Sequence, residues 1–153
     1  MAVVFPNQGH YEKALELYER VSAGYEKILG VDHPATLTIV NNMVSALGNQ
    51  GQHDKALELY ERALARRQKA LGLDHPDTLT TVHNMASIFS NQEQYEKALE
   101  FYKWALAGRK KALGIDHPYT QNTLCGLVDL HKCAGQTEQA QSLQARLHTP
   151  KSP

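Results

Sequence analysis

The chain has 153 residues, of which 42% are hydrophobic and 21% are charged. Sixteen basic residues balance sixteen acidic ones, so the net charge gives no reason to expect nucleic acid, an anionic membrane or an acidic substrate as a partner. No apolar run approaches the roughly 18 residues of a membrane span, and residues 1–6 lack the basic start and apolar core of a signal peptide, so we expect a cytoplasmic protein.

One short stretch recurs at a fixed interval. Leu71 to Leu79 reads Leu-Gly-Leu-Asp-His-Pro-Asp-Thr-Leu, and close copies begin 42 residues earlier at Leu29 and 42 residues later at Leu113. Residues 11–52 and 53–94 are identical in more than half of their aligned columns, and residues 95–136 follow the same pattern. A fixed period in a short chain indicates stacked supersecondary units, so we predict a single array over residues 1–147.

The chain begins part-way through this period. Met1 to His10 aligns with Met85 to Gln94, so residues 1–9 are predicted to be the end of a truncated helix that a short turn joins to the first full repeat. Two interpretations remain open. The chain either starts here naturally with a frayed cap or is a fragment of a longer array, and we favour the fragment.

Each repeat opens with a long amphipathic helix. In the second repeat, Ala56, Tyr60, Ala63 and Leu64 recur at steps of three and four residues, and strong helix formers dominate the segment. The glycine that follows, Gly72, suits the left-handed residue that closes a helix. The same pattern predicts helices that end before Gly30 and Gly114.

The recurring stretch, which we call the joint, also starts a second helix. Proline is favoured in the first turn of a helix, and the Asp or His before it can accept hydrogen bonds from free backbone amides. Pro76 to Gln92 is therefore predicted as the partner helix, and the short turn before Tyr95 makes consecutive helices antiparallel. Residues 137–147 are predicted as a degenerate capping helix, and residues 148–153 as a disordered tail whose Thr-Pro and Ser-Pro pairs have no assigned role.

These residues resemble a known family. Asn84-Met85-Ala86, Phe89, Tyr95, Ala98, Tyr102 and Ala105, with the joint Leu-Gly-Xaa-Asp-His-Pro-Xaa-Thr, are similar to the tetratricopeptide repeat (TPR), in the 42-residue subtype of kinesin light chains and of fungal NACHT-type or NB-ARC-type signalling ATPases. The resemblance implies an all-α solenoid of antiparallel helix hairpins that form a right-handed superhelix. It also implies a concave groove lined by the partner helices. Cys125-Gly126 in place of His83-Asn84 departs from the pattern.

The groove placed by this resemblance is rich in amides and hydroxyls. Helix geometry alone puts the residues on one stripe of each partner helix, at steps of three and four. Side-chain amides both donate and accept, so such a stripe suits an extended peptide backbone. The alternative is that Asn42 and Asn84 only cap carbonyls or hold adjacent helices together. The predicted groove residues are Thr38, Asn41, Asn42, Ser45, Asn49, Thr80, His83, Asn84, Ser87, Asn91, Asn122 and Asp129, with Cys125 beside them.

The residues of the predicted groove, its floor, can be compared with those that bind two ligand classes in the family. Some tetratricopeptide domains hold the carboxylate tail of a chaperone with lysines and arginines, and the predicted floor contains neither, so this ligand is disfavoured. Kinesin light chains take extended cargo peptides in which acidic residues flank an aromatic one. Asn41-Asn42 resembles their paired asparagines, and the preference of this chain stays open.

The sequence does not predict a metal site, a disulfide or a catalytic site. The three joint histidines lie one repeat apart along an array, so capping explains them better than a metal site, and no cofactor is expected. Cys125 and Cys133 are eight residues apart on one predicted helix, about 12 Å, too far for a disulfide. No phosphate-binding loop, GxSxG motif or paired catalytic carboxylates occur, so we do not expect an enzyme.

Two repeated features have structural interpretations. Tyr18, Tyr60 and Tyr102 are predicted to lie in the core between helices. The basic clusters Arg66-Arg67 and Arg109-Lys110-Lys111 could form a phosphate-binding ridge, but exposed cations near helix C-termini are the simpler interpretation.

The predicted function is therefore that of a non-catalytic scaffold that binds a protein or an extended peptide in the groove. The alternative is a structural or oligomerisation array within a larger NLR-like signalling protein, without a specific peptide ligand. Val3, Val4 and Phe5 on the incomplete first helix would favour end-to-end self-association.

Overall fold

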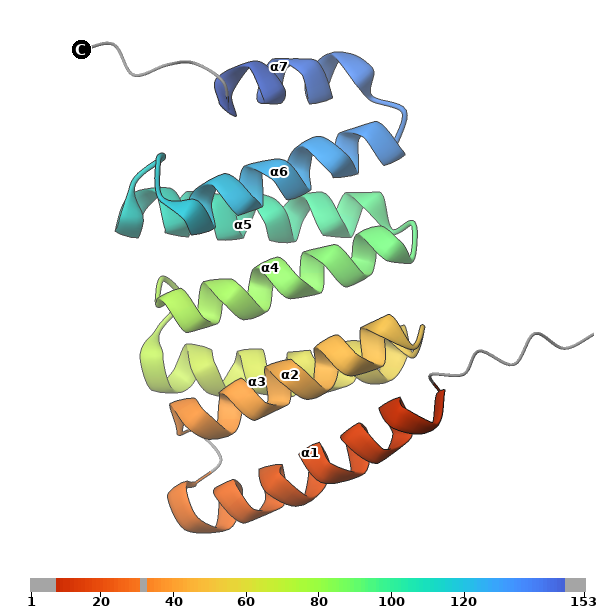
Figure 1. The fold of residues 1–153 in the computed structure, drawn as a ribbon. Coiled ribbons are helices and arrows are strands. Elements are labelled where there is room, and N and C mark those ends of the chain that lie inside the picture. Colours follow the sequence, from red (N-terminus) through yellow and green to blue (C-terminus); the bar gives the residue numbers. More distant parts are fainter. Residues whose placement is uncertain (1–7, 31–32, 148–153) are drawn as a thin grey trace, which may run out of the picture. The chain divides into compact units, whose positions relative to one another are not determined.

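The computed structural model describes residues 8–30 and 33–147 (Figure 1). Within these ranges the chain forms seven helices and no strand, which confirms the predicted all-α fold. None of the helices in this part of the chain is long and apolar enough to cross a membrane. The helices are α1 (Gln8–Leu29), α2 (Pro34–Asn49), α3 (His53–Leu71), α4 (Pro76–Asn91), α5 (Tyr95–Leu113), α6 (Pro118–Cys133) and α7 (Thr137–Leu147).

The chain divides into two compact units, residues 1–70 and 71–153. In the first unit, α1 packs along α2, and a three-residue turn leads from α2 into α3. Residues of all three helices line a small pocket of about 70 Å³, which includes Val40, Met43 and Leu59. Tyr60 is 1% exposed, as predicted for a core position, whereas Tyr18 is only half-buried.

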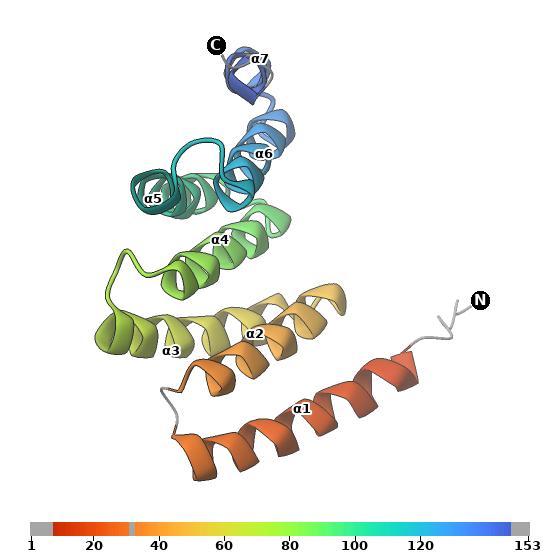
Figure 2. The ribbon, with the colours of Figure 1, turned by 60° about the vertical axis from the view of Figure 1, so that its left-hand side comes forward.

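The second unit contains two hairpins, α4 with α5 and α6 with α7 (Figure 2). Apolar residues at helical spacing form its core, and Leu79, Val82 and Met85 of α4 are at most 1% exposed. Close packing between helices depends on glycine. A Cβ atom added at Gly126 of α6 would lie 2.7 Å from the Tyr102 ring of α5, so only glycine fits at this contact.

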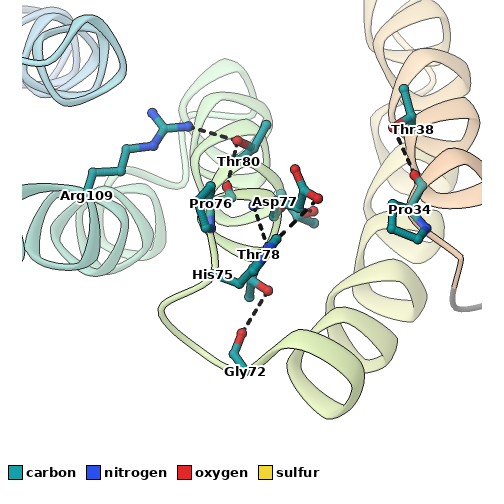
Figure 3. A network of polar contacts seen from close by, with 10 residues as sticks. Pro34, Thr38, Gly72, His75, Pro76, Asp77, Thr78, Thr80 and Arg109 are labelled. Carbon is teal, nitrogen blue, oxygen red and sulfur yellow. Dashed lines mark hydrogen bonds and ion pairs between the residues drawn. The ribbon is translucent and has the colours of Figure 1, made fainter. Parts of the chain in front are cut away.

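The joint stops one helix and starts the next, as predicted. Gly72 has a positive φ of 94°, and its carbonyl accepts a hydrogen bond of 2.8 Å from the Thr78 hydroxyl (Figure 3). His75 is the N-cap of α4, and its Nδ1 accepts from the Asp77 N–H at 3.2 Å. His33 and His117 cap α2 and α6 with the same geometry. The histidines therefore have the capping role that the sequence suggested.

One boundary differs from the sequence interpretation, and one turn has an unexpected backbone conformation. α1 begins at Gln8, so Gln8 to His10 are helical and do not form the predicted turn. Glu93, in the turn between α4 and α5, has a positive φ of 60°, where Gly51 and Gly135 stand in the other two turns. The predictions for residues 1–7, including Val3, Val4 and Phe5, and for the tail 148–153 lie outside the described residues.

The interpretation of the basic clusters was wrong for one arginine in each. Arg67 is 1% exposed and Arg109 is 3% exposed, while Lys110 and Lys111 are exposed as expected. The helical spacing gives the reason. Arg109 continues the buried stripe of Ala98, Tyr102 and Ala105 at the next step of four residues, so it faces the core and not the solvent.

Candidate peptide-binding face

The stripe on α2 is mostly open to solvent. The side chains of Thr38, Asn42 and Ser45 are exposed, and the Thr38 hydroxyl donates to the Pro34 carbonyl at 2.9 Å within the helix. Asn41 is half-buried, and its Oδ1 is buried with no hydrogen-bond partner among the described residues. The part of this stripe that is free to meet a ligand therefore consists of Thr38, Asn42 and Ser45. The Asn49 side chain lies outside the described residues.

The stripe on α4 is half-buried because it also contacts α5. The Ser87 hydroxyl lies 2.9 Å from the Tyr102 hydroxyl. The His83 ring meets the Tyr102 ring edge to face, with centroids 5.4 Å apart. Asn84 is half-buried, and Asn91 is exposed at the end of the helix. His83 and Ser87 therefore hold the hairpin together as well as contributing to the predicted floor.

Arg109 ties three helices together beneath this stripe. Its Nη1 donates to the Tyr119 carbonyl at 2.9 Å and to the Thr123 hydroxyl at 2.7 Å, both on α6. Its Nη2 donates to the Thr80 hydroxyl of α4 at 3.3 Å (Figure 3). The guanidinium also lies over the Tyr119 ring, 5.5 Å from its centroid. Burial lowers the pKa of Arg109, and these hydroxyl and carbonyl oxygens provide acceptors for its buried charge.

His83 is neutral at physiological pH. Burial, and to a smaller extent the positive charge of Arg109, lower its pKa to about 4. Its Nδ1 is buried and has no hydrogen-bond partner among the described residues. A buried N–H without an acceptor is costly, so the arrangement favours the tautomer with its proton on Nε2.

The stripe on α6 is fully exposed. Asn122, Cys125 and Asp129 all have open side chains, and the Asp129 carboxylate makes a surface ion pair of 3.8 Å with Lys132. Cys125 and Cys133 are free thiols on the same helix. Within the described ranges no three His, Cys, Asp or Glu side chains are grouped so as to hold a metal ion.

The sequence analysis did not identify Arg109 as the residue that connects Thr80 with α6. The signal for it was present, since Arg67 and Arg109 recur in register at the four-residue step after a buried alanine. In the second unit the structure brings Thr80, His83 and Ser87 into contact with α5. It leaves Asn91, Asn122 and Asp129 on the surface.

Comparison with protein-family models agrees with this architecture. Residues 2–35 and 36–111 each match a model described as tetratricopeptide repeat. The chain belongs to the tetratricopeptide repeat family. Repeats of this family generally mediate protein–protein interactions. A search of curated proteins found no match.

Solved structures show the same solenoid fold and confirm the predicted kinesin-light-chain-like subtype. Two structures of nearly identical TPR-like repeats, from a provisional kinesin light chain of Podosopora anserina, are each 28% identical to this chain, with TM-scores of 0.79 and 0.78. They cover 92% of this chain, which in turn spans 66% and 67% of theirs. BtubC (BKLC) from P. vanneervenii, at 20% identity and a TM-score of 0.80, shares the fold over 95% of this chain and 61% of its own.

Proposed function

We propose that this TPR array is a non-catalytic scaffold that binds an extended peptide along its polar stripes, that of α2 in the first unit and those of α4 and α6 in the second. The supporting observation is that each of these helices carries exposed amide or hydroxyl side chains, at positions that differ from one repeat to the next. Asn42 on α2, Asn91 on α4 and Asn122 on α6 are exposed. Exposed amides can pair with both the N–H and the C=O groups of a peptide backbone.

His83 and Ser87 are half-buried, so they are poor positions for a mutational test of this proposal. Replacing either one also removes a contact with Tyr102, so a loss of binding would be confounded by a loss of stability. The exposed amides avoid this difficulty, because surface substitutions usually change stability by less than about 0.5 kcal/mol.

The test is a pulldown from a library of random extended peptides, followed by affinity measurement on the recovered peptides. We expect the triple variant Asn42→Ala, Asn91→Ala, Asn122→Ala to bind at least about tenfold more weakly, since each lost hydrogen bond contributes about 1 kcal/mol. The control carries Glu61→Ala, Glu100→Ala and Gln141→Ala, three exposed positions on α3, α5 and α7. Unchanged affinity in the asparagine variant, at an unchanged melting temperature, would refute the groove.

A second function, a structural array that associates with other copies or modules, is favoured by α1. Several of its large apolar side chains are open to solvent: Ile28 is 80% exposed, Leu17 57% and Val21 41%. Exposed apolar patches mark interaction sites. Sedimentation velocity over a concentration series tests this function. A dimer that dissociates in the Leu17→Glu, Ile28→Glu variant and that ignores peptides would support the array and contradict peptide recognition.

A further inference from the structure

The second unit has an apolar pocket on the side away from the polar stripe. The pocket has a volume of about 460 Å³ and is lined by residues of α5, α6 and α7. Its apolar lining comes from all three helices: Leu99 and Leu106 from α5, Leu127 from α6 and Leu143 from α7. This volume falls in the range of about 300 to 1,000 Å³ that is typical of ligand clefts.

The α4–α5 hairpin, one repeat earlier, shows which side chains occupy the corresponding position there. The residues one period before His131 and Leu143 are Phe89 and Phe101. In the α4–α5 hairpin these two rings pack with centroids 5.2 Å apart, and Phe89 is only 7% exposed. Lys97 lies over the Phe89 ring at 5.6 Å. The α4–α5 hairpin is thus closed by a pair of phenyl rings.

In the α6–α7 hairpin both phenyl rings are missing. His131 and Leu143 are among the residues that line the pocket, and both are smaller than phenylalanine. Four leucines keep part of the lining apolar, while His131, Lys103, Glu138, Gln139 and Ser142 give it a polar rim, so the site has lost aromatic volume on its apolar side. An open apolar pocket on the surface is unfavourable unless a partner covers it.

We propose that this pocket binds an aromatic side chain presented by a partner protein. The leucine side chains supply apolar contact to the faces and edges of a ring, at a place where this fold accommodates two phenyl groups one repeat earlier. Lys103 on α5 is an exposed lining residue whose ammonium group can interact with the face of a bound ring, while the position one period after Lys97 is Gln139. One partner aromatic group would thus complete the hairpin.

This site is independent of the proposed peptide groove. On α6 the polar stripe runs through Asn122 and Asp129, whereas the pocket uses Leu127 and His131. Leu127 is five residues from Asn122 and His131 is two from Asp129, so at about 100° per residue the two sets point to roughly opposite sides of the helix. A partner could occupy the pocket whether or not a peptide binds in the groove.

The test uses blocked amino acids as probes, with the leucine methyl groups of the full chain followed by NMR. We expect N-acetyl-tryptophan amide and N-acetyl-phenylalanine amide to cause saturable shifts at Leu99, Leu106, Leu127 and Leu143. N-acetyl-leucine amide should bind at least about fivefold more weakly. Absence of saturable shifts, equal binding of the leucine probe, or shifts centred on other leucines would each overturn the proposal.

A filling variant provides the decisive comparison. His131→Phe with Leu143→Phe restores the aromatic pair of the α4–α5 hairpin, so it should keep or raise the melting temperature and weaken probe binding at least tenfold. Leu73→Phe adds a ring at a position that is 57% exposed and should leave binding unchanged. If the filled protein does not fold, Leu143→Asn, which places an amide in the apolar lining, should weaken binding instead. Undiminished binding in the folded filling variant, or in Leu143→Asn, would refute the site.

Discussion

Gly126 is where the packing of the second unit can be tested most directly. A Cβ atom there would lie 2.7, 2.8 and 2.9 Å from Cε1, Cζ and Oη of Tyr102. Carbon atoms in contact normally lie about 3.5 to 4.0 Å apart, so Gly126→Ala requires a shift of roughly 0.8 Å. The Tyr102 ring cannot move freely away from an added methyl group. Tyr102 is 4% exposed, its hydroxyl is hydrogen-bonded to the Ser87 hydroxyl, and its ring packs against the His83 ring.

Two opposing terms set the magnitude of this effect. Overpacking of a core contact costs about 1 to 3 kcal/mol. Alanine in a helix interior is more favourable than glycine by about 1 kcal/mol. We therefore expect Gly126→Ala to destabilise the protein by up to about 2 kcal/mol. Gly24, in α1, has nothing within 4 Å of an added Cβ, so Gly24→Ala should be neutral or stabilising by up to about 1 kcal/mol.

Urea unfolding followed by far-UV circular dichroism measures both variants. The expected difference between them is about 1 to 3 kcal/mol, in favour of Gly24→Ala. In a Tyr102→Leu background the Gly126→Ala penalty should largely disappear, because the ring that causes the clash is gone. If Gly126→Ala is as stable as Gly24→Ala in the wild-type background, the proposed close contact between α5 and α6 is wrong.

Three further predictions concern the polar contacts and the backbone. Arg109→Ala should cost about 2 to 4 kcal/mol, because it removes a buried side chain and three hydrogen bonds, whereas the exposed control Lys110→Ala should cost less than about 0.5 kcal/mol in the same urea experiment. Equal effects would place Arg109 on the surface. Glu93→Gly should raise the free energy of unfolding by about 0.5 to 1 kcal/mol, since it relieves a left-handed residue where the other two turns have glycine; a lower melting temperature would contradict this account. His83 has a folded pKa of about 4 against 6.5 when unfolded, so the unfolded state binds the extra proton and stability should fall by up to about 3 kcal/mol as the pH drops from 6.5 to 4. His83→Asn, which copies Asn41 of the first repeat, should flatten that part of the pH profile, and an unaltered profile would show that other groups cause it.

Local rules of the chain were sufficient to predict the helices and most of their ends, with the start of α1 as an exception. The residues of the joint are enough to end one helix and begin the next. Glycine permits the positive φ that closes the first helix, the histidine ring caps the second helix, and proline suits its first turn. The 42-residue period then predicted the stacked repeats, and the resemblance of their residues to the tetratricopeptide repeat indicated the family. These features depend on residues only a few positions apart, so the sequence contains them directly.

Contacts between helices were decided by the tertiary structure. Arg109 looked like an exposed cation in the sequence, yet packing against Thr80 and Thr123 makes it a buried link among three helices. His83 looked like an open groove residue, yet the Tyr102 ring covers one side of it and lowers its availability to a ligand. Periodicity shows which side of a helix a residue occupies, but burial depends on the size of the side chains that the neighbouring helices bring to that side. The pocket around Leu143 likewise depends on side-chain size, because it lies where Phe89 and Phe101 of one repeat are replaced by the smaller His131 and Leu143 in the next.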